Sequence, residues 1–187
     1  MNSKNKTKQA IFGGGCFWCL EPIFENIKGV SSVVPGYAGG TKENPTYEEV
    51  LSEKTGHAEV VRIEYNEAEI HYEKLVNFFF SIHDPTTLNR QGDDVGSQYR
   101  SIVMYQDESQ KSVVNEIIRE LEAEKVYGNK IVTEVVPFEK FYEAEEEHHH
   151  YYKKNPNKAY CRLVIFPKLK KFRAKYGEYL SDQVNEH

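Results

Sequence analysis

One short segment near the start of the chain constrains both the fold and the chemistry. Three glycines are followed by two cysteines three residues apart, in the run Gly13-Gly14-Gly15-Cys16-Phe17-Trp18-Cys19. The apolar run at residues 10–12 comes just before the glycines and predicts a short buried strand. After them, apolar residues recur at the spacing of one helix face: Leu20, Ile23, Phe24 and Ile27. The segment therefore predicts a strand, a glycine turn and an amphipathic helix. Pro22 belongs in that helix's first turn, which places its start near residues 17–21, and Gly29 ends it.

The remaining periodicity predicts alternating strands and helices. The predicted strands are residues 30–37, 59–65, 101–105, 131–136 and 163–166. The predicted helices are residues 72–83, a long one capped by Asp107, a polar one over 143–152, and a basic one over 167–180 opened by Pro167. The polar stretch 84–97 fits neither period and is interpreted as a long functional or packed loop. We expect one catalytic α+β domain over 1–187, a two-layer sandwich with a mixed sheet, flanking helices and an irregular C-terminal region.

Composition narrows the classes of protein that the chain can belong to. The chain has 187 residues, of which 39% are hydrophobic and 28% charged, as in a globular domain. Its net charge of −5 gives no reason to expect a nucleic-acid binder. The polar start of the chain lacks the apolar stretch of a signal peptide, and no apolar run approaches the length of a membrane span. We therefore expect a cytoplasmic protein without membrane or nucleic-acid partners, in which three cysteines are too few for a disulfide framework.

The cysteine pair suggests thiol chemistry. Cys16 lies where a glycine turn meets a helix start, and the free N–H groups and helix dipole there stabilise a thiolate. Cys19, three residues on, is close enough in a helix to form a bridge with it. The competing interpretation is that both are small core fillers. A phosphate-binding loop is excluded because no Gly-Lys-Ser/Thr follows the glycines, and a tyrosine phosphatase because Pro22 stands where its Arg would be. Structural zinc is disfavoured because Cys161 has no second ligand at the right spacing.

Seven motifs in order resemble those of the methionine sulfoxide reductase A family. They are Gly15-Cys16-Phe17-Trp18, Gly36-Tyr37-Ala38-Gly39-Gly40, Asn44-Pro45-Thr46-Tyr47, Thr55-Gly56-His57-Ala58-Glu59, His83-Asp84-Pro85, Arg90-Gln91-Gly92 and Gln98-Tyr99-Arg100-Ser101. The resemblance covers residues 10–161 and implies a ferredoxin-like two-layer sandwich. It implies reduction of the S epimer of methionine sulfoxide, protein-bound or free, in repair of oxidised proteins. Thioredoxin or a small dithiol would supply the electrons, without a cofactor, and we expect a monomer.

The chemistry of sulfoxide reduction needs a thiolate and an acid that protonates the oxygen. Cys16 would be the nucleophile. Glu59 shares a strand face with Val61 and Ile63, where burial would keep its carboxyl protonated; a solvated strand end is the alternative. The family resemblance places the general acid at Glu59.

The resemblance also selects the residues around this pair. Tyr47 and Tyr99 would donate hydrogen bonds to the sulfoxide oxygen. Asp94 matches the family's active-site Asp. Its neighbours depart from the family pattern, since Asp93 stands where Asn is common and Val95 where His is frequent. Phe17 and Trp18 would hold the substrate methyl group, with core packing the alternative for Phe17. The Cys16 sulfenic acid left by the reaction would be resolved by Cys19, which we favour slightly, or by Cys161.

Two charged features remain. The run His148-His149-His150 is interpreted as a solvated polar face and not as a metal site, because consecutive helical residues point in different directions. The basic C-terminal helix is interpreted as solvated on one side and packed through Leu169, Phe172 and Tyr176 on the other.

Two other functions remain as alternatives to the reductase. One is a general dithiol–disulfide oxidoreductase using Cys16 and Cys19. The other is a non-enzymatic redox sensor or zinc-binding interaction module using the basic helix.

Overall fold

A computed structural model describes residues 7–181 of the chain. The polar segment 1–6, where no signal peptide was expected, lies outside the described residues. The strands are β1 (Thr7–Gly13), β2 (Val30–Ala38), β3 (Ala58–Asn66), β4 (Arg90–Gln91), β5 (Asp94–Val95), β6 (Ile102–Tyr105), β7 (Glu134–Pro137) and β8 (Phe141–Glu143). The α-helices are α1 (Phe17–Phe24), α2 (Tyr47–Leu51), α3 (Tyr72–Ile82), α4 (Glu108–Ala123), α5 (Tyr151–Lys154) and α6 (Phe166–Tyr176).

Six of these strands form a mixed sheet in the order β7-β6-β1-β3-β2-β8. All neighbouring strands are antiparallel except β6 and β7, which are parallel. The prediction of an α+β fold with a mixed sheet is confirmed. In the described part of the chain, none of the helices is both long and apolar enough to span a bilayer.

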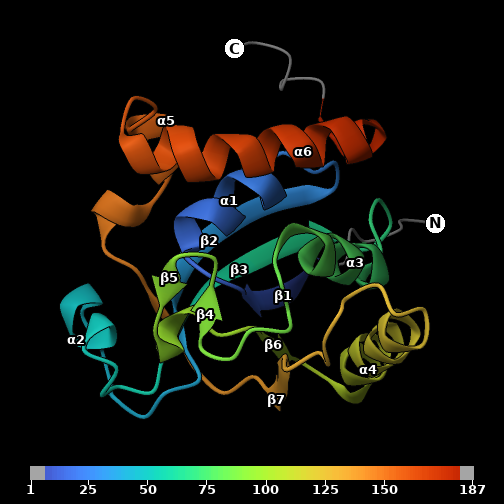
Figure 1. Cartoon of the computed structure of the whole chain (residues 1–187), viewed down its shortest axis with the longest axis horizontal. Helices are drawn as coiled ribbons and strands as arrows, with labels where there is room; N and C mark the ends of the chain where they lie inside the picture. The colour runs from blue at the N-terminus through green and yellow to red at the C-terminus, as the bar shows by residue number, and fades with distance from the viewer. Residues whose placement is uncertain (1–6, 182–187) are drawn as a thin grey trace.

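The sheet has two apolar faces that differ in size. On one face, residues such as Phe12, Val61 and Ile63 belong to the large core that α1, α3, α4 and α6 complete. On the other, Ile11, Val60 and their neighbours form a smaller cluster. Figure 1 shows α6 lying across α1, so that the C-terminal helix covers the helix that follows the glycine turn.

The glycine turn joins β1 to α1 as predicted. Gly15 has a φ of +89°, a conformation that side chains other than glycine rarely adopt. A Cβ atom on Gly13 would lie 2.7 Å from the backbone oxygen of Glu59, so the close approach of β1 to β3 requires glycine there. The turn therefore sets Cys16 beside the start of β3.

The end of α1 differs from the prediction. Pro22 is the sixth residue of the helix, not part of its first turn, and it removes the hydrogen bond to the Trp18 carbonyl. The helix ends two residues later at Phe24, and Gly29, with a φ of +86°, belongs to the turn into β2. Almost every residue of α1 is buried, and this packing keeps Pro22 inside the helix.

Two predicted elements of the C-terminal third are wrong. Residues 143–152 form no continuous helix: Glu143 ends β8, a 3₁₀ turn spans Glu146–His148, and left-handed His150 (φ 52°) precedes α5. Residues 163–166 are not a strand but part of a π-helical turn, Cys161–Ile165, that leads into α6. A short apolar run does not distinguish a strand from a helix segment, and here Ile165 continues the helix stripe of Leu169 and Phe172.

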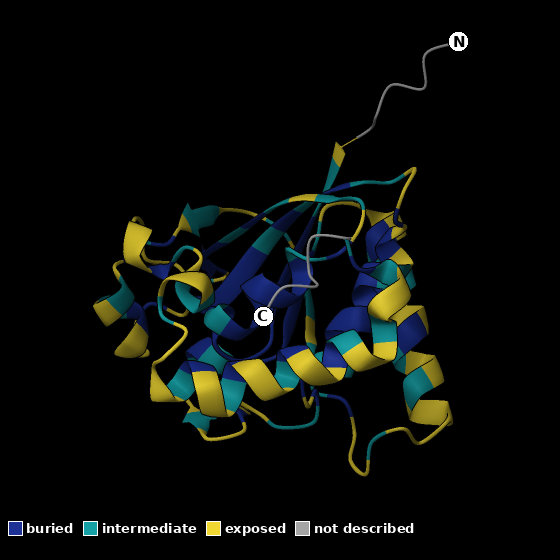
Figure 2. Cartoon of the chain, turned by 90° about the horizontal axis from the view of Figure 1, so that it is seen from above, coloured by how far each residue is buried: buried dark blue, intermediate teal, exposed yellow. Residues whose placement is uncertain are grey.

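The other predictions differ mainly at their boundaries. The Asp107 side chain accepts a hydrogen bond from Gln110 N (2.9 Å) and caps α4, as predicted. Residues 84–97, expected to be irregular, contain the short β4–β5 hairpin. The basic helix ends at Tyr176 and buries Leu169 and Phe172. Figure 2 shows how α6 alternates between buried and exposed residues along its length.

Candidate active site

Cys16 is the N-cap residue of α1 and is only 5% exposed. The Gly15 N–H just before it donates to the Tyr99 carbonyl (3.1 Å), which fixes the turn against the 3₁₀ turn Ser97–Tyr99. The expectation that the helix start would lower the pKa of Cys16 is wrong for this resting structure. Burial raises the pKa of the thiol, and Glu59 and Cys19 raise it further, whereas only the backbone N–H of Trp18 opposes them. The Cys16 thiol therefore keeps its proton until something changes its surroundings.

Glu59 lies in β3 opposite Tyr37 and is completely buried. Its Oε2 accepts a hydrogen bond from Phe17 N (3.0 Å), and its Oε1 has no hydrogen-bond partner among the described residues. Burial raises the pKa of this carboxyl to about 8, with the Phe17 N–H acting in the opposite direction. The strand pattern is compatible with burial and with a solvated strand end, and the structure shows burial. At neutral pH the group is mostly a neutral acid that can donate the proton of its hydroxyl.

Two phenols and a second carboxylate act on this pair electrostatically. Burial raises the pKa of both Tyr47 and Tyr99, and the carboxyl of Glu59 and the thiol of Cys16 raise it further. Asp94 raises the pKa values of Cys16 and Glu59. The fold brings these three predicted residues to the site from α2, the 3₁₀ turn and β5. The result is two neutral hydroxyl donors beside a thiol and an acid.

The two aromatic residues after Cys16 differ in exposure. Phe17 is completely buried and contacts Tyr37, with ring centroids 5.8 Å apart. Trp18 is half-buried and stacks on Tyr151 at 3.7 Å. Its indole N–H donates to His148 Nδ1 (3.1 Å). Phe17 is thus a core residue that reaches the site through its backbone N–H, whereas Trp18 offers part of its ring to the surface.

The three cysteines are reduced and buried. Cys19 and Cys161 share one small apolar cluster with Ile165, so the helical turn before α6 brings the distal cysteine next to the local one. Burial raises the pKa of both thiols. On Cys19 this effect is opposed first by the positive charge of Lys168.

Tyr160 is a site residue that the sequence analysis did not single out. Its hydroxyl donates to Asp94 Oδ2 (2.8 Å) and lies 3.6 Å from Cys19 Sγ. Its ring meets that of Trp18 edge-on at 5.9 Å. The only signal in the sequence was its position beside Cys161.

Glu145 and His148 also join the site, from the segment expected to be a solvated helix. Glu145 accepts hydrogen bonds from the Tyr37 hydroxyl and from Tyr47 N, both at 2.7 Å. His148 is buried against Trp18. The interpretation of the histidine run as a solvated face is wrong for His148, because the lone Trp needs a partner for its N–H.

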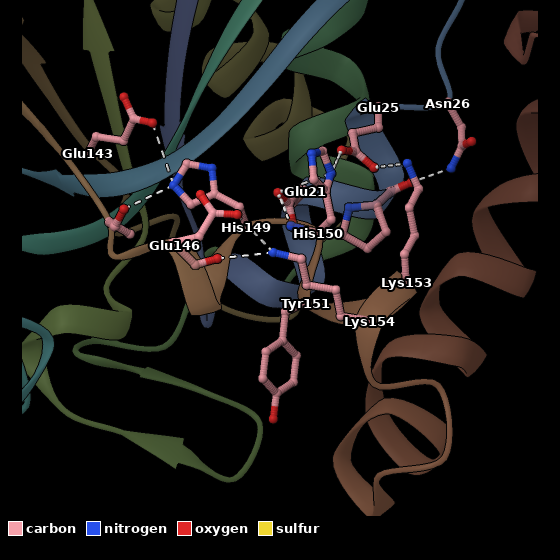
Figure 3. A network of polar contacts seen from close by, with 12 residues as sticks. Glu21, Glu25, Asn26, Glu143, Glu146, His149, His150, Tyr151, Lys153 and Lys154 are labelled. Carbon is pink, nitrogen blue, oxygen red and sulfur yellow. Dashed lines mark hydrogen bonds and ion pairs between the residues drawn. The ribbon is translucent and has the colours of Figure 1, made fainter.

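The other two histidines point elsewhere (Figure 3). His149 Nε2 lies 2.9 Å from the Ala144 carbonyl. His150 Nδ1 is 2.5 Å from Glu25 and 3.8 Å from Glu21, and these three residues offer ligand-type atoms within 4.8 Å of one another. However, the ammonium of Lys153 lies 2.8 Å from the second oxygen of Glu25. A cation is thus already present, and the cluster is an ion-pair network that ties α1 to α5.

The fold and the site together define a class. A glycine turn holds the Cys16 thiol at a helix start beside a buried neutral acid. Two further thiols, Cys19 and Cys161, share one apolar cluster. This arrangement is typical of an oxidoreductase that works through cysteine chemistry. The model of the family described as peptide methionine sulfoxide reductase matches residues 8–180. The chain belongs to this family.

Curated relatives and solved structures agree with this assignment. The chain is 55% identical over 175 residues to the peptide methionine sulfoxide reductase MsrA of Sulfolobus acidocaldarius, covering 94% of this chain and 98% of that protein. It is 57% identical to MsrA of Saccharolobus solfataricus, over 87% and 91% of the two chains. It is similar to the reduced form of Mxr1 from Saccharomyces cerevisiae, with a TM-score of 0.76 and 34% identity over 86% and 92% of the chains. Mxr1 has also been solved in complex with Trx2; that structure covers 81% of this chain and 88% of its own, with a TM-score of 0.54 and 26% identity.

Proposed function

We propose that this chain reduces the S epimer of methionine sulfoxide, in proteins or free, and that thioredoxin restores the enzyme. The observation that carries the proposal is the pairing of Cys16 with a completely buried Glu59 whose pKa is raised to about 8. Thiol–disulfide exchange breaks no bond to oxygen and so does not require an acid that protonates an oxygen. Reduction of a sulfoxide needs one, because the oxygen leaves only when it is protonated.

The first half-reaction would use both groups. The sulfur of Cys16 attacks the sulfoxide sulfur while Glu59 donates its proton to the sulfoxide oxygen. The proton lost by the Cys16 thiol passes to the Glu59 carboxylate, so the acid is restored and no net proton is consumed. The S–O bond of the substrate breaks and an S–O bond forms on Cys16, which leaves methionine and a Cys16 sulfenic acid. Two electrons have moved from the thiol to the substrate. The Tyr47 and Tyr99 phenols would donate hydrogen bonds to the oxygen as negative charge develops on it.

A second thiol would then resolve the sulfenic acid. Attack by Cys19 on the Cys16 sulfur forms a disulfide and releases the oxygen as water. We favour Cys19 because it lies one helical turn from Cys16 and because Lys168 supports its thiolate. Cys161, in the same apolar cluster as Cys19, is the second candidate, either directly or by exchange with the first disulfide.

The remaining site residues would position the substrate. Trp18, stacked between neighbouring rings, would hold the S-methyl group, with Phe17 closing the site from the core side. Asp94 would orient the loop and Tyr160.

Thioredoxin as reductant is supported by the structure of the relative Mxr1 in complex with Trx2. Thioredoxin or a small dithiol would be the only electron source, with no prosthetic group.

We also propose a ferredoxin-like core, supported by the βαββαβ order of β1-α1-β2-β3-α3-β6 and by the sheet order β6-β1-β3-β2. Finally, we propose that the chain acts as one catalytic domain and as a cytoplasmic monomer.

The test is an epimer-resolved assay. The protein is incubated with a peptide carrying racemic methionine sulfoxide and with dithiothreitol, and each epimer is quantified by chromatography. Consumption of only the S epimer, lost in Cys16→Ser and kept in the wild type, supports the proposal. Absence of consumption under reducing conditions refutes it. Two further assays then separate the alternatives: reduction of insulin disulfides would indicate a general disulfide exchange enzyme, and binding of zinc would indicate a redox sensor or zinc-binding module.

A further inference from the structure

A cavity of about 330 Å³ lies between α6, the C-terminal end of α3 and the loop after it. It is separate from the cysteine cluster. Its lining includes three lysines of α6, Lys168, Lys171 and Lys175, which follow one another at the spacing i, i+3, i+7 and so share one helix face. Asp84 is the one acidic residue among the lining residues.

The three ammonium groups are unpaired in the described part of the chain. Within residues 7–181, none of them forms an ion pair or a side-chain hydrogen bond; Lys175 lies over the ring of Tyr176, 5.1 Å from its centroid. Asp84 is engaged in its own turn, where its Oδ1 accepts from Thr86 N (2.9 Å) and from the Thr86 hydroxyl (2.6 Å). Three like charges on one helix face repel one another unless an anion lies between them.

Two other polar side chains of the cavity wall, those of His83 and Gln91, are already hydrogen-bonded within the protein. Both nitrogens of the His83 ring are used, one with the Phe79 carbonyl (2.6 Å) and one with the Ser101 hydroxyl (2.8 Å). Burial lowers the pKa of this ring to about 4, so it is neutral at pH 7. The Gln91 amide bonds to the backbone N–H and carbonyl of Asp84, at 3.1 and 3.0 Å. Because His83 and Gln91 are neutral, the charge of the cavity lining comes from three lysines and one aspartate. Their net charge of +2 is available to bind an anion.

We propose that this cavity binds a small phosphate-bearing anion, held by Lys168, Lys171 and Lys175. Lysine binds phosphate as a compact point charge, and no arginine with the forked geometry that suits a carboxylate lines the cavity. The volume suits a ligand of one or two phosphate groups better than a long peptide. The local charge is opposite in sign to the −5 of the whole chain, so the attraction is confined to this face.

The ligand would contact two parts of the molecule that border the active site. Gln91, in the cavity wall, packs against Gly15: a Cβ atom placed there would lie 2.7 Å from Gln91 Cγ. Lys168 is three residues after Ile165, which shares the apolar cluster of Cys19 and Cys161. A bound anion would therefore lie between α6 and the loop that supports the glycine turn.

The test measures binding of inorganic phosphate and of pyrophosphate by titration calorimetry, at constant ionic strength maintained with chloride. We expect one-to-one saturable binding, tighter for pyrophosphate. Loss of one ammonium in Lys171→Gln or Lys175→Gln is expected to weaken binding about tenfold, as for a hydrogen bond to a charged group. Lys170→Gln removes the same charge from an exposed position of α6 that does not line the cavity, and it should bind as the wild type does.

Two outcomes would overturn the proposal. One is no saturation with either anion up to about 10 mM, which corresponds to negligible affinity. The other is equal weakening in Lys170→Gln, which would show general attraction to a basic helix and no site. The substituted positions are exposed, and thermal denaturation of each variant in chloride alone verifies that it folds. Binding is measured without substrate or thioredoxin, so the result is independent of the reductase reaction.

Discussion

Glu59 contributes a pH-dependent part of the folding free energy, and Glu59→Gln isolates it. The pKa of the carboxyl rises from an ordinary value of 4.5 to about 8 because the side chain is completely buried. Between these two values the folded state holds a proton that the unfolded state has lost, so the free energy of unfolding falls as pH rises. The contribution is fully present below about pH 4.5 and is lost as pH rises to about 8.

The magnitude follows from the size of the shift. Each pH unit within the window is worth about 1.4 kcal/mol, which gives a loss of about 3 kcal/mol at pH 7 and about 5 kcal/mol above pH 8. Gln cannot ionise, and its side-chain oxygen can still accept the hydrogen bond from Phe17 N. Glu59→Gln should therefore remove this pH dependence while it keeps the shape of the site.

The assay is urea denaturation of both proteins between about pH 5 and about pH 9, with a reductant present. We expect the stability of Glu59→Gln relative to the wild type to rise by about 4 kcal/mol across this range. Glu64→Gln is the matched control, because Glu64 lies on the same strand but is partly exposed. If the wild type and Glu59→Gln vary with pH in parallel, the carboxyl is not a buried neutral acid and the reasoning about the site is refuted.

Three further predictions concern catalysis and stability. Glu59→Gln should lower kcat for methionine sulfoxide by about 10²–10⁴-fold, the usual contribution of a general acid, in an assay with dithiothreitol; a loss below about tenfold would contradict the proposed role. Cys19→Ser should abolish turnover with thioredoxin but retain one equivalent of methionine per enzyme in a single-turnover experiment, and full turnover in Cys19→Ser together with loss in Cys161→Ser would assign the resolving role to Cys161. Asp107→Ala should cost about 1 kcal/mol in urea denaturation, because it removes the hydrogen bond that caps α4; an unchanged midpoint would contradict this.

Local pattern was sufficient where each residue's environment follows from its neighbours in the chain. Strand alternation correctly predicted that Glu59 lies on the same face of the strand as Val61 and Ile63, because alternate residues of a strand point to the same face. It did not decide between burial and a solvated strand end. The three glycines correctly predicted a tight turn before α1, and Asp107 predicted a cap. The motifs shared with the family identified the polar residues near the thiol, which periodicity alone could not have separated from thirteen tyrosines and twenty-nine acids.

Local pattern failed where distant segments compete for the same residues. The segment after β8 reads as a polar helix, but its side chains bond to three different elements: Glu145 to β2 and α2, His148 to α1, and His150 to Glu25 beyond the end of α1. A regular helix could not direct three side chains of one short segment to so many partners. The same segment thus supplied site residues that the sequence analysis had assigned to solvent.

The sequence by itself determined where the reactive thiol lies and which residue types accompany it, because a glycine turn, a helix start and strand parity are local properties of the chain. Only the tertiary structure decided their electrostatics. The helix start would lower the pKa of the Cys16 thiol, but burial, Glu59 and Cys19 together raise it. Likewise, only packing of the turn before α6 against α1 brings Tyr160 and Cys161 to Cys19. Desolvation depends on every element that covers a group, and no stretch of sequence records which elements those are.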